Sequence, residues 1–379
     1  MRPRVLIVSY HAANPLTPRG ARSQAAAAAL SARADVRVIA GPDPAGRRLW
    51  WHPARDRALF EIGSRWLIDP LEPWSWKALA GRSLDADVAM LIGYPFSPLV
   101  AAAGGLRRHG VPYVVDISDP WALTRSDGQA PTLRDRRSAA LERRLWSGAA
   151  AGIVTTAAQG RDLRKLVPGL DILVRPNGYT DVGAVRAAPR VAADDELRIG
   201  HFGSLYAPRV DITSFLRRLV ESGRWRRVVL QQYGRDHYGE LRRFEKLVTV
   251  QQRNPVPWPE AVRLAAEEID IGLVVGNTDV RQLPSKAIEY LTLPVPRLAL
   301  TGGQAGDALA DYVDGKPGWL TLSVDDPDAA TRVWDHICRR WTVEELTAPA
   351  DESWQRVAEQ LASFVLRKSA GGAGVRALA

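Results

Sequence analysis

The apolar residues in the first half of the chain form short unbroken runs separated by helical repeats. Such runs are typical of strands buried on both faces, and they lie at residues 5–8, 36–39, 88–92, 113–117 and 152–155. Between them, residues 23–33 and 98–109 repeat apolar positions at helical spacing. The alternation predicts a doubly wound α/β domain with a parallel sheet, whose ligands bind beyond the carboxyl ends of the strands.

The second half of the chain repeats this plan. Its apolar runs lie at residues 197–202, 227–231, 247–250, 271–275 and 297–300. Residues 175–195, rich in Pro, Gly, Ala and Asp, have no clear period and separate the halves. We therefore expect Rossmann-like domains at residues 1–180 and 181–350. A helix at 351–368 is expected to pack back across the domains, and 369–379 to form a flexible tail.

Composition narrows the class of protein. The 379 residues carry a formal net charge of +9 and one cysteine, which excludes an internal disulfide framework and a cysteine-based zinc site. No apolar run approaches membrane-spanning length and the first residues do not resemble a secretory signal, so we expect a cytoplasmic protein. The positive charge favours anionic partners such as nucleotide phosphates or acidic lipids. Nucleic acid is not expected, because no motif for its recognition is found.

The segment 283–291 is the most informative part of the chain. Pro284 and Ser285 suit the start of a helix, where unpaired amides and a hydroxyl can donate to an anion. Lys286 adds a mobile positive charge, and Glu289, on the same side of the first turn, can accept hydrogen bonds from sugar hydroxyls. The pattern therefore fits a site for a sugar nucleotide. A surface helix with an ordinary ion pair explains it equally well.

The loop after the first apolar run of the second half contains a second candidate for anion binding. Gly203 allows the backbone to pass close to a ligand, Ser204 follows it, and Arg209 is placed to bind a phosphate with two hydrogen bonds. A plain turn with a solvated arginine is the alternative. Lys286 strengthens the functional interpretation, because it would follow a neighbouring strand of the same sheet.

These motifs, taken in order, resemble the GT-B glycosyltransferases, especially the retaining enzymes of family 4. The similar segments are 203–205 with Arg209, 284–291, the Asp-Pro-Trp element within 114–121, and the Pro-Asn-Gly element within 175–181. The resemblance implies two Rossmann-like domains that face each other across a cleft. It also implies transfer of a sugar, with retention and without a metal or other cofactor, from a nucleoside diphosphate to a hydroxyl acceptor. A glycan, a lipid-linked intermediate of polysaccharide biosynthesis or a natural product fits as acceptor.

The resemblance also implies roles for individual residues. Arg209 and Lys286 correspond to residues that bind the donor pyrophosphate, and Glu289 to the residue that binds the ribose. Residues 251–257 correspond to the lining of the base pocket. The chain departs from the family where the first of two glutamates is usual, because Arg281 stands there. Gln282 or the loop at Asp279 is then expected on that side of the sugar.

The first domain holds candidates for the acceptor side. Asp119 follows a predicted strand where many relatives carry a histidine, and its carboxylate can contact the transferred sugar or the acceptor hydroxyl. A cap for the turn before Pro120 is the alternative. The resemblance places Gly20 and Arg22 on the acceptor side, with His11 nearby. A simple strand-to-helix connection explains that loop as well.

Residues 47–82 combine aromatic and basic side chains. The tryptophans are Trp50, Trp51, Trp66, Trp74 and Trp76, with six arginines and a lysine among them. This composition suits peripheral contact with an anionic membrane at its inner face, or sugar stacking in an acceptor groove. Tryptophans packed in the core, with arginines reaching outward, explain it equally well.

Two other kinds of function remain open at the level of sequence. A GT-B-shaped sugar-nucleotide epimerase or an inverting transferase would use the same donor, and an inverting enzyme needs a general base, for which His11 and Asp119 are the visible candidates. A catalytically silent protein that binds a nucleotide sugar is the third possibility, because Arg281 replaces the usual glutamate.

Overall fold

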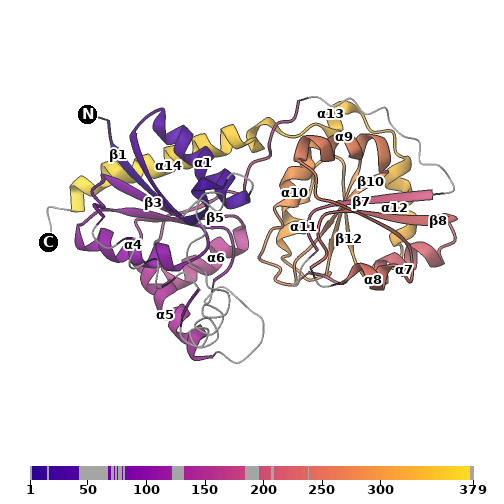
Figure 1. Ribbon diagram of the computed structural model, residues 1–379, viewed down its shortest axis with the longest axis horizontal. Helices are drawn as coiled ribbons and strands as arrows, with labels where there is room; N and C mark the ends of the chain where they lie inside the picture. Colours follow the sequence, from indigo (N-terminus) through magenta and orange to yellow (C-terminus); the bar gives the residue numbers. More distant parts are fainter. Residues whose placement is uncertain are drawn as a thin grey trace. The chain divides into compact units, whose positions relative to one another are not determined.

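The chain forms two α/β units, each built on a parallel sheet (Figure 1). The computed structural model describes residues 2–14, 17–41, 67–69, 72, 75, 79, 82–121, 132–183, 196–205, 209–237 and 239–375. The first unit comprises Met1–Asn177 and Trp354–Ala379, and the second comprises Gly178–Ser353. The chain thus leaves the first unit three residues before the expected boundary and returns to it at Trp354.

The sheet of the first unit has the strand order β2-β1-β3-β4-β5-β6. Its strands are β1 (Arg4–Ser9), β2 (Asp35–Ala40), β3 (Val88–Ile92), β4 (Tyr113–Ile117), β5 (Ala151–Val154) and β6 (Ile172–Val174). The helical segments are η1 (Tyr10–Ala13), α1 (Pro18–Ser31), α4 (Ser97–Arg108), α5 (Leu133–Ser147), α6 (Ala157–Leu166) and α14 (Trp354–Val375). All five strands expected from the apolar runs are present.

Successive residues of β1 enter opposite hydrophobic layers, because side chains alternate along a strand. Val5 and Ile7 pack in the layer that includes α1 and α14, whereas Leu6 and Val8 pack in the layer that includes α4 and α5. The helix α14 runs beside α1 (Figure 1). It therefore belongs to the first unit, and it continues to Val375 through part of the segment expected to be flexible.

The sheet of the second unit has the order β12-β11-β10-β7-β8-β9. Its strands are β7 (Glu196–Phe202), β8 (Arg227–Tyr233), β9 (Thr249–Arg253), β10 (Ile271–Val275), β11 (Arg297–Thr301) and β12 (Trp319–Ser323). The helical segments are α7 (Thr213–Glu221), α8 (Leu241–Phe244), α9 (Trp258–Glu268), α10 (Lys286–Glu289), η2 (Tyr290–Thr292), α11 (Ala308–Val313), α12 (Ala329–Cys338), α13 (Val343–Leu346) and η3 (Ala350–Glu352).

Both sheets reverse their strand order at one place. In the first unit the reversal lies between β1 and β3, and in the second it lies between β7 and β10. The loops that leave two such neighbouring strands run in opposite directions, so a crevice opens at their carboxyl ends, where open α/β sheets bind ligands. Candidate ligand-binding residues are therefore those that follow β1 and β3 in the first unit, and those that follow β7 and β10 in the second.

Some of the expected features lie outside the described residues. The five tryptophans of the segment 47–82 are among them, so the structure does not address their proposed membrane or acceptor roles. Across the described ranges, no helix has both the length and the apolar character needed to cross a membrane.

Candidate functional site

Arg209 is anchored at the reversal point of the second sheet. It pairs with Asn277 in an isolated antiparallel bridge, and its Nη1 donates to the carbonyl of Val275 at 2.5 Å. Val275 is the last residue of β10, and β10 lies beside β7. The guanidinium group is therefore held at the carboxyl end of β10, near the start of the crevice.

Lys286 lies against the loop that follows β7. A Cβ atom added to Gly203 would lie 3.0 Å from Cε of Lys286, so the absence of a side chain at Gly203 lets the lysine stem pack there. Its Nζ lies 2.6 Å from Oε2 of Glu289 and 5.4 Å from the ring centroid of Trp258. Both charged side chains are 29% exposed. The ion pair between Lys286 and Glu289, which a plain surface helix would also explain, is thus present. It lies beside the loop that follows β7.

The structure places Arg209 and Lys286 around one buried side chain, His201 of β7. Burial and the charges of Arg209 and Lys286 lower the pKa of His201 to about 3, whereas its hydrogen bond to Gln232 acts in the opposite direction. Both cations are close enough to affect His201. The two residues assigned to a pyrophosphate therefore lie on the same side of the second unit.

The helix start at residues 284–286 differs from the expectation. The helix α10 has four residues, followed directly by the 3-10 turn η2, and Ser285 makes no side-chain capping bond. The carbonyl of Pro284 accepts from the amide of Ala287 at 3.0 Å. A helix this short has a weak dipole. An anion in the crevice would therefore depend mainly on the side chains of Lys286 and Arg209.

Arg281 and Asp279 form a fork-shaped ion pair in the loop after β10. Nε and Nη2 of Arg281 each lie 3.0 Å from a different carboxylate oxygen of Asp279. The Asp279 carboxylate is thus paired with Arg281, the residue that stands where the first glutamate of the family is usual. The neighbouring Gln282 accepts from Nδ2 of Asn277 through its main-chain carbonyl at 3.1 Å, which ties the loop to the bridge with Arg209.

The segment assigned to the base pocket begins at the same edge of the sheet. The carbonyl of Arg253, the last residue of β9, accepts from the amide of Gly234 at 3.1 Å. A Cβ atom on Gly234 would lie 2.1 Å from the carbonyl oxygen of Gly203, so these backbones are in close contact. Gly234 therefore links the end of β9 to the loop that begins at Gly203.

In the first unit, Asp119 forms an ion pair with Arg19 at the reversal point of the sheet. The two side chains are 27% and 32% exposed, respectively. The guanidinium of Arg19 lies 5.3 Å from the ring centroid of Tyr94, which follows β3. Burial and the charge of Arg19 lower the pKa of His11, which follows β1. These four residues form what we call the Arg19 cluster.

Sequence reasoning missed Arg19 and Tyr94. Arg19 directly precedes Gly20 at the start of α1, where Thr17 caps the helix by accepting from the Gly20 amide at 3.0 Å. Its position in the loop was a usable signal. The sequence contained no signal for Tyr94, because a tyrosine after a strand is as often a packing residue as a functional one.

The structure shows packing contacts for Gly20 and Arg22, the two residues that the resemblance places on the acceptor side. A Cβ atom on Gly20 would lie 1.7 Å from the carbonyl oxygen of Asn14, so Gly20 permits close packing of the loop. Arg22 is 2% exposed, and its Nε donates to Oδ2 of Asp116 at 2.7 Å. It also donates to the carbonyls of Arg175 and Pro176 and to the Asn177 side chain. Arg22 thus anchors the last residues before the second unit.

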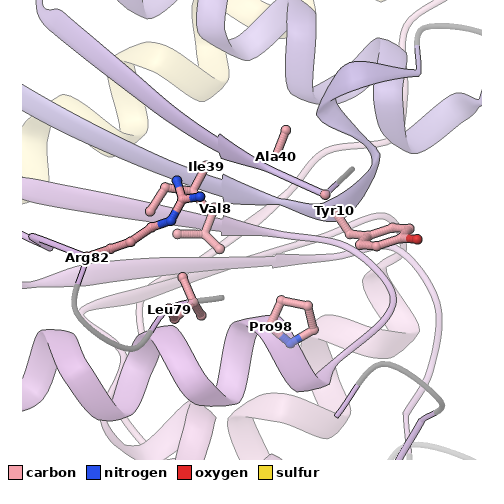
Figure 2. Close-up of a pocket in the computed structure, with 8 residues that line it drawn as sticks. Val8, Tyr10, Ile39, Ala40, Leu79, Arg82 and Pro98 are labelled. Carbon is pink, nitrogen blue, oxygen red and sulfur yellow. The ribbon is translucent and has the colours of Figure 1, made fainter. Parts of the chain in front are cut away.

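A small, mainly apolar pocket lies in the first unit, at the ends of β1 and β2 (Figure 2). Its lining residues are Val8, Tyr10, Ile39, Ala40, Gly41, Leu79, Arg82 and Pro98. Arg82 supplies the positive charge in this lining. Elsewhere, no group of three or more His, Cys, Asp or Glu among the described residues is arranged to hold a metal ion.

Comparison with known proteins agrees with this architecture. Residues 19–178 match the family model described as glycosyl transferase 4-like domain. No curated protein matches the chain. HepE from Anabaena, in complex with UDP and glucose, has a TM-score of 0.55 at 14% identity, with 99% of both chains covered. Sucrose-phosphate synthase from Thermosynechococcus elongatus has a TM-score of 0.59 at 14% identity, with 99% of this chain and 98% of that chain covered.

A Listeria monocytogenes structure assigned as a UDP-N-acetylglucosamine 2-epimerase is also similar, with a TM-score of 0.55, 12% identity and 95% of both chains covered. Identities this low establish the fold alone. The matches show the GT-B architecture of two Rossmann-like domains, and residues 19–178, within the first unit except for the last one, are similar to a glycosyl transferase 4-like domain. The resemblance to family 4-like GT-B glycosyltransferases is confirmed.

Proposed function

We propose that the protein transfers a sugar from a nucleoside diphosphate-sugar donor to a hydroxyl acceptor. The observation that carries the proposal is the placement of two cations at the reversal point of the second sheet: Arg209 is held at the carbonyl of Val275, which ends β10, and Lys286 packs against Gly203, which follows β7. Two cations at such a crevice suit the two phosphates of a donor. The similar fold of HepE, which was crystallised with UDP and glucose, supports a nucleotide-sugar partner.

In the proposed reaction the bond between the sugar and the diphosphate breaks, and negative charge grows on the leaving diphosphate. Arg209 and Lys286 would stabilise that charge more strongly as the bond breaks, which lowers the barrier. Lys286 would exchange Glu289 for a phosphate oxygen. Glu289 would then be available to accept hydrogen bonds from the ribose.

The proposal assigns the acceptor to the first unit. Asp119 would contact the transferred sugar or the acceptor hydroxyl, with Arg19 setting its position. The apolar pocket lined by Val8 and Leu79 supports an acceptor that carries an apolar part, such as a lipid-linked intermediate. Peripheral contact with an anionic membrane at its inner face belongs to the same proposal and rests on the composition of residues 47–82.

We propose further that transfer proceeds with retention and without a metal ion. Retention rests on the resemblance to family 4. Metal independence rests on the same resemblance and on Arg209 and Lys286, whose two positive charges can compensate a diphosphate. Transfer that survives EDTA, with a product of unchanged anomeric configuration by NMR, is the expected result; loss of activity on chelation or an inverted product would contradict these two points.

An epimerase is the second candidate, because one structure of similar fold is assigned to that activity. A protein that binds the donor silently is the third, since Arg281 is paired with Asp279 where a glutamate is usual. Incubation with uridine, guanosine, thymidine and adenosine diphosphate sugars, with and without hydroxyl acceptors, separates the three. A glycosylated acceptor supports the proposal. An isomerised donor without transfer favours the epimerase, and binding without any product favours the silent protein.

A further inference from the structure

Two buried residues on neighbouring strands lead to the loop that begins at Gly203. His201 of β7 and Gln232 of β8 are register partners, and they are 3% and 0% exposed, respectively. Nδ1 of His201 lies 2.7 Å from Oε1 of Gln232, and Nε2 of Gln232 donates to the Gly203 carbonyl. The three residues form a continuous hydrogen-bonded chain that ends at the crevice.

The direction of this chain defines the tautomer of the histidine. Because an amide oxygen only accepts hydrogen bonds, Nδ1 of His201 must carry the hydrogen, and the Gln232 amide then directs its N–H toward the Gly203 carbonyl. Burial and the nearby charges of Arg209 and Lys286 keep the imidazole neutral. The ring thus donates to Gln232 without adding a third positive charge beside the two cations.

The group that this chain orients is the peptide bond between Gly203 and Ser204. This bond is trans, so its C=O and N–H point in opposite directions. Since Gln232 takes the carbonyl, the N–H of Ser204 points away from the buried pair. Within the part of the chain that the structure describes, no backbone hydrogen bond uses the Ser204 N–H.

The surroundings leave this peptide little freedom. The stem of Lys286 packs against Gly203 on one side, and Gly234 lies against the Gly203 carbonyl on the other. Arg209 follows the same loop. An amide donor held in one orientation, with the side chain of Lys286 packed against the same peptide, is a suitable partner for an anionic oxygen.

We propose that His201 and Gln232 are positioning residues that hold the Ser204 N–H ready to donate to a diphosphate oxygen of the donor. The inference deepens the proposed function and rests on it. In this proposal His201 and Gln232 affect the binding of the diphosphate, and not that of the base or the ribose. They act through the peptide bond between Gly203 and Ser204 and do not contact the diphosphate themselves.

The Gln232→Glu variant tests the inference in the full-length protein. A carboxylate in place of the amide repels the Gly203 carbonyl, so the peptide should turn and the Ser204 N–H should lose its orientation. By calorimetry, affinity for uridine diphosphate should fall about tenfold or more, and affinity for uridine should stay the same. Gln231→Glu is the matched control, because Gln231 is an adjacent buried glutamine on the opposite face of the strand. It should leave the ratio of the two affinities unchanged.

Variants of His201 provide an independent test if Gln232→Glu fails to fold. His201→Leu removes the donor to Gln232 and should weaken binding of uridine diphosphate, whereas His201→Gln supplies an N–H again and should restore it to within about threefold. Equal losses for uridine diphosphate and uridine, or unchanged diphosphate affinity in a folded Gln232→Glu or His201→Leu protein, would overturn the inference. Wild-type protein that binds none of the four nucleoside diphosphates would instead overturn the proposed function, and this inference with it.

Discussion

The ammonium group of Lys286 lies 2.6 Å from the carboxylate of Glu289, although each is proposed to bind a different part of the donor. The two residues therefore neutralise each other's charge. Binding must exchange this pair for contacts with phosphate and ribose. Each of the two side chains is 29% exposed, so breaking the ion pair costs little free energy, about 0.2–1 kcal/mol.

Replacement of Glu289 by Gln should separate the contribution of Lys286 to phosphate binding from that of Glu289 to ribose binding. Free Lys286 should bind inorganic pyrophosphate about two- to fivefold more tightly, because its competing carboxylate is gone. Uridine diphosphate should bind about tenfold more weakly, because the charged acceptor for the ribose hydroxyls is lost. Calorimetry with both ligands measures this. Parallel changes for the two ligands would show that Glu289 does not contact the ribose.

The pair of Arg281 and Asp279 offers a test of donor selectivity. Asp279→Asn removes the negative charge of Asp279 beside the guanidinium of Arg281, so an anionic sugar should become a better substrate. We expect the ratio of kcat/KM for a glucuronate donor to that for a glucose donor to rise about tenfold. Arg198→Gln, which breaks the ion pair of Arg198 with Glu196 at the start of β7, is the control. An unchanged ratio in Asp279→Asn would place the loop away from the sugar.

Arg22 and Asp116 should dominate the stability of the first unit. Their side chains are 2% and 1% exposed, and Arg22→Met leaves a buried carboxylate without its cation. The free energy of unfolding, measured with urea, should fall by about 3–5 kcal/mol. Arg4→Met breaks the ion pairs of Arg4 with Asp85 and Asp87, which are largely exposed, and should cost about 1 kcal/mol or less. Similar losses for the two variants would refute the assigned role of Arg22.

The protein should lose stability in mild acid through two histidines of the second unit, His201, which is buried, and His336, which is half-buried. Burial lowers the pKa of His201 to about 3 and that of His336 to about 4. In the unfolded chain both titrate near about 6.5, so below that pH the unfolded state binds more protons and stability falls as the pH falls. The loss continues to about pH 4 for His336 and about pH 3 for His201.

At about pH 5 each histidine should have removed about 2 kcal/mol relative to neutral pH. Denaturant unfolding at several pH values measures the slope. In His336→Gln the slope between about pH 6.5 and 4 should be smaller, because one of the two titrating groups is absent. A slope identical to that of the wild type would show that His336 is not kept neutral in the folded protein.

The sequence predicted the strands and the two-unit plan because buried parallel strands consist of continuous apolar runs, which are local features of the sequence. The runs at 88–92 and 113–117 coincide with β3 and β4. Pairings between distant residues were not readable. Arg22 meets Asp116 and Arg19 meets Asp119 across separations of 94 and 100 residues. In sequence both arginines look like loop cations, and the fold makes one a buried anchor and the other part of the Arg19 cluster.

The same contrast holds in the second unit. Local motifs pointed to Gly203, Arg209 and Lys286, because each follows or lies near the end of a strand at the reversal of the sheet. His201 and Gln232 carried no such signal. Polar residues within apolar runs acquire meaning only when the register of β7 and β8 brings them together.

The most direct test of the account compares two lysine variants for binding of nucleoside diphosphates. Lys286 pairs with Glu289 and lies over Trp258, and Lys316 likewise pairs with Glu352 at 2.5 Å and lies 4.7 Å from the ring centroid of Tyr312. The two residues are thus matched in surroundings, but only Lys286 lies at the crevice.

Lys286→Ala should weaken the binding of uridine diphosphate by about tenfold to a hundredfold in calorimetry, because it removes a charged hydrogen bond to phosphate. Lys316→Ala should leave that affinity unchanged. Equal affinities of the two variants, with both proteins folded, would contradict the assignment of the diphosphate to this crevice.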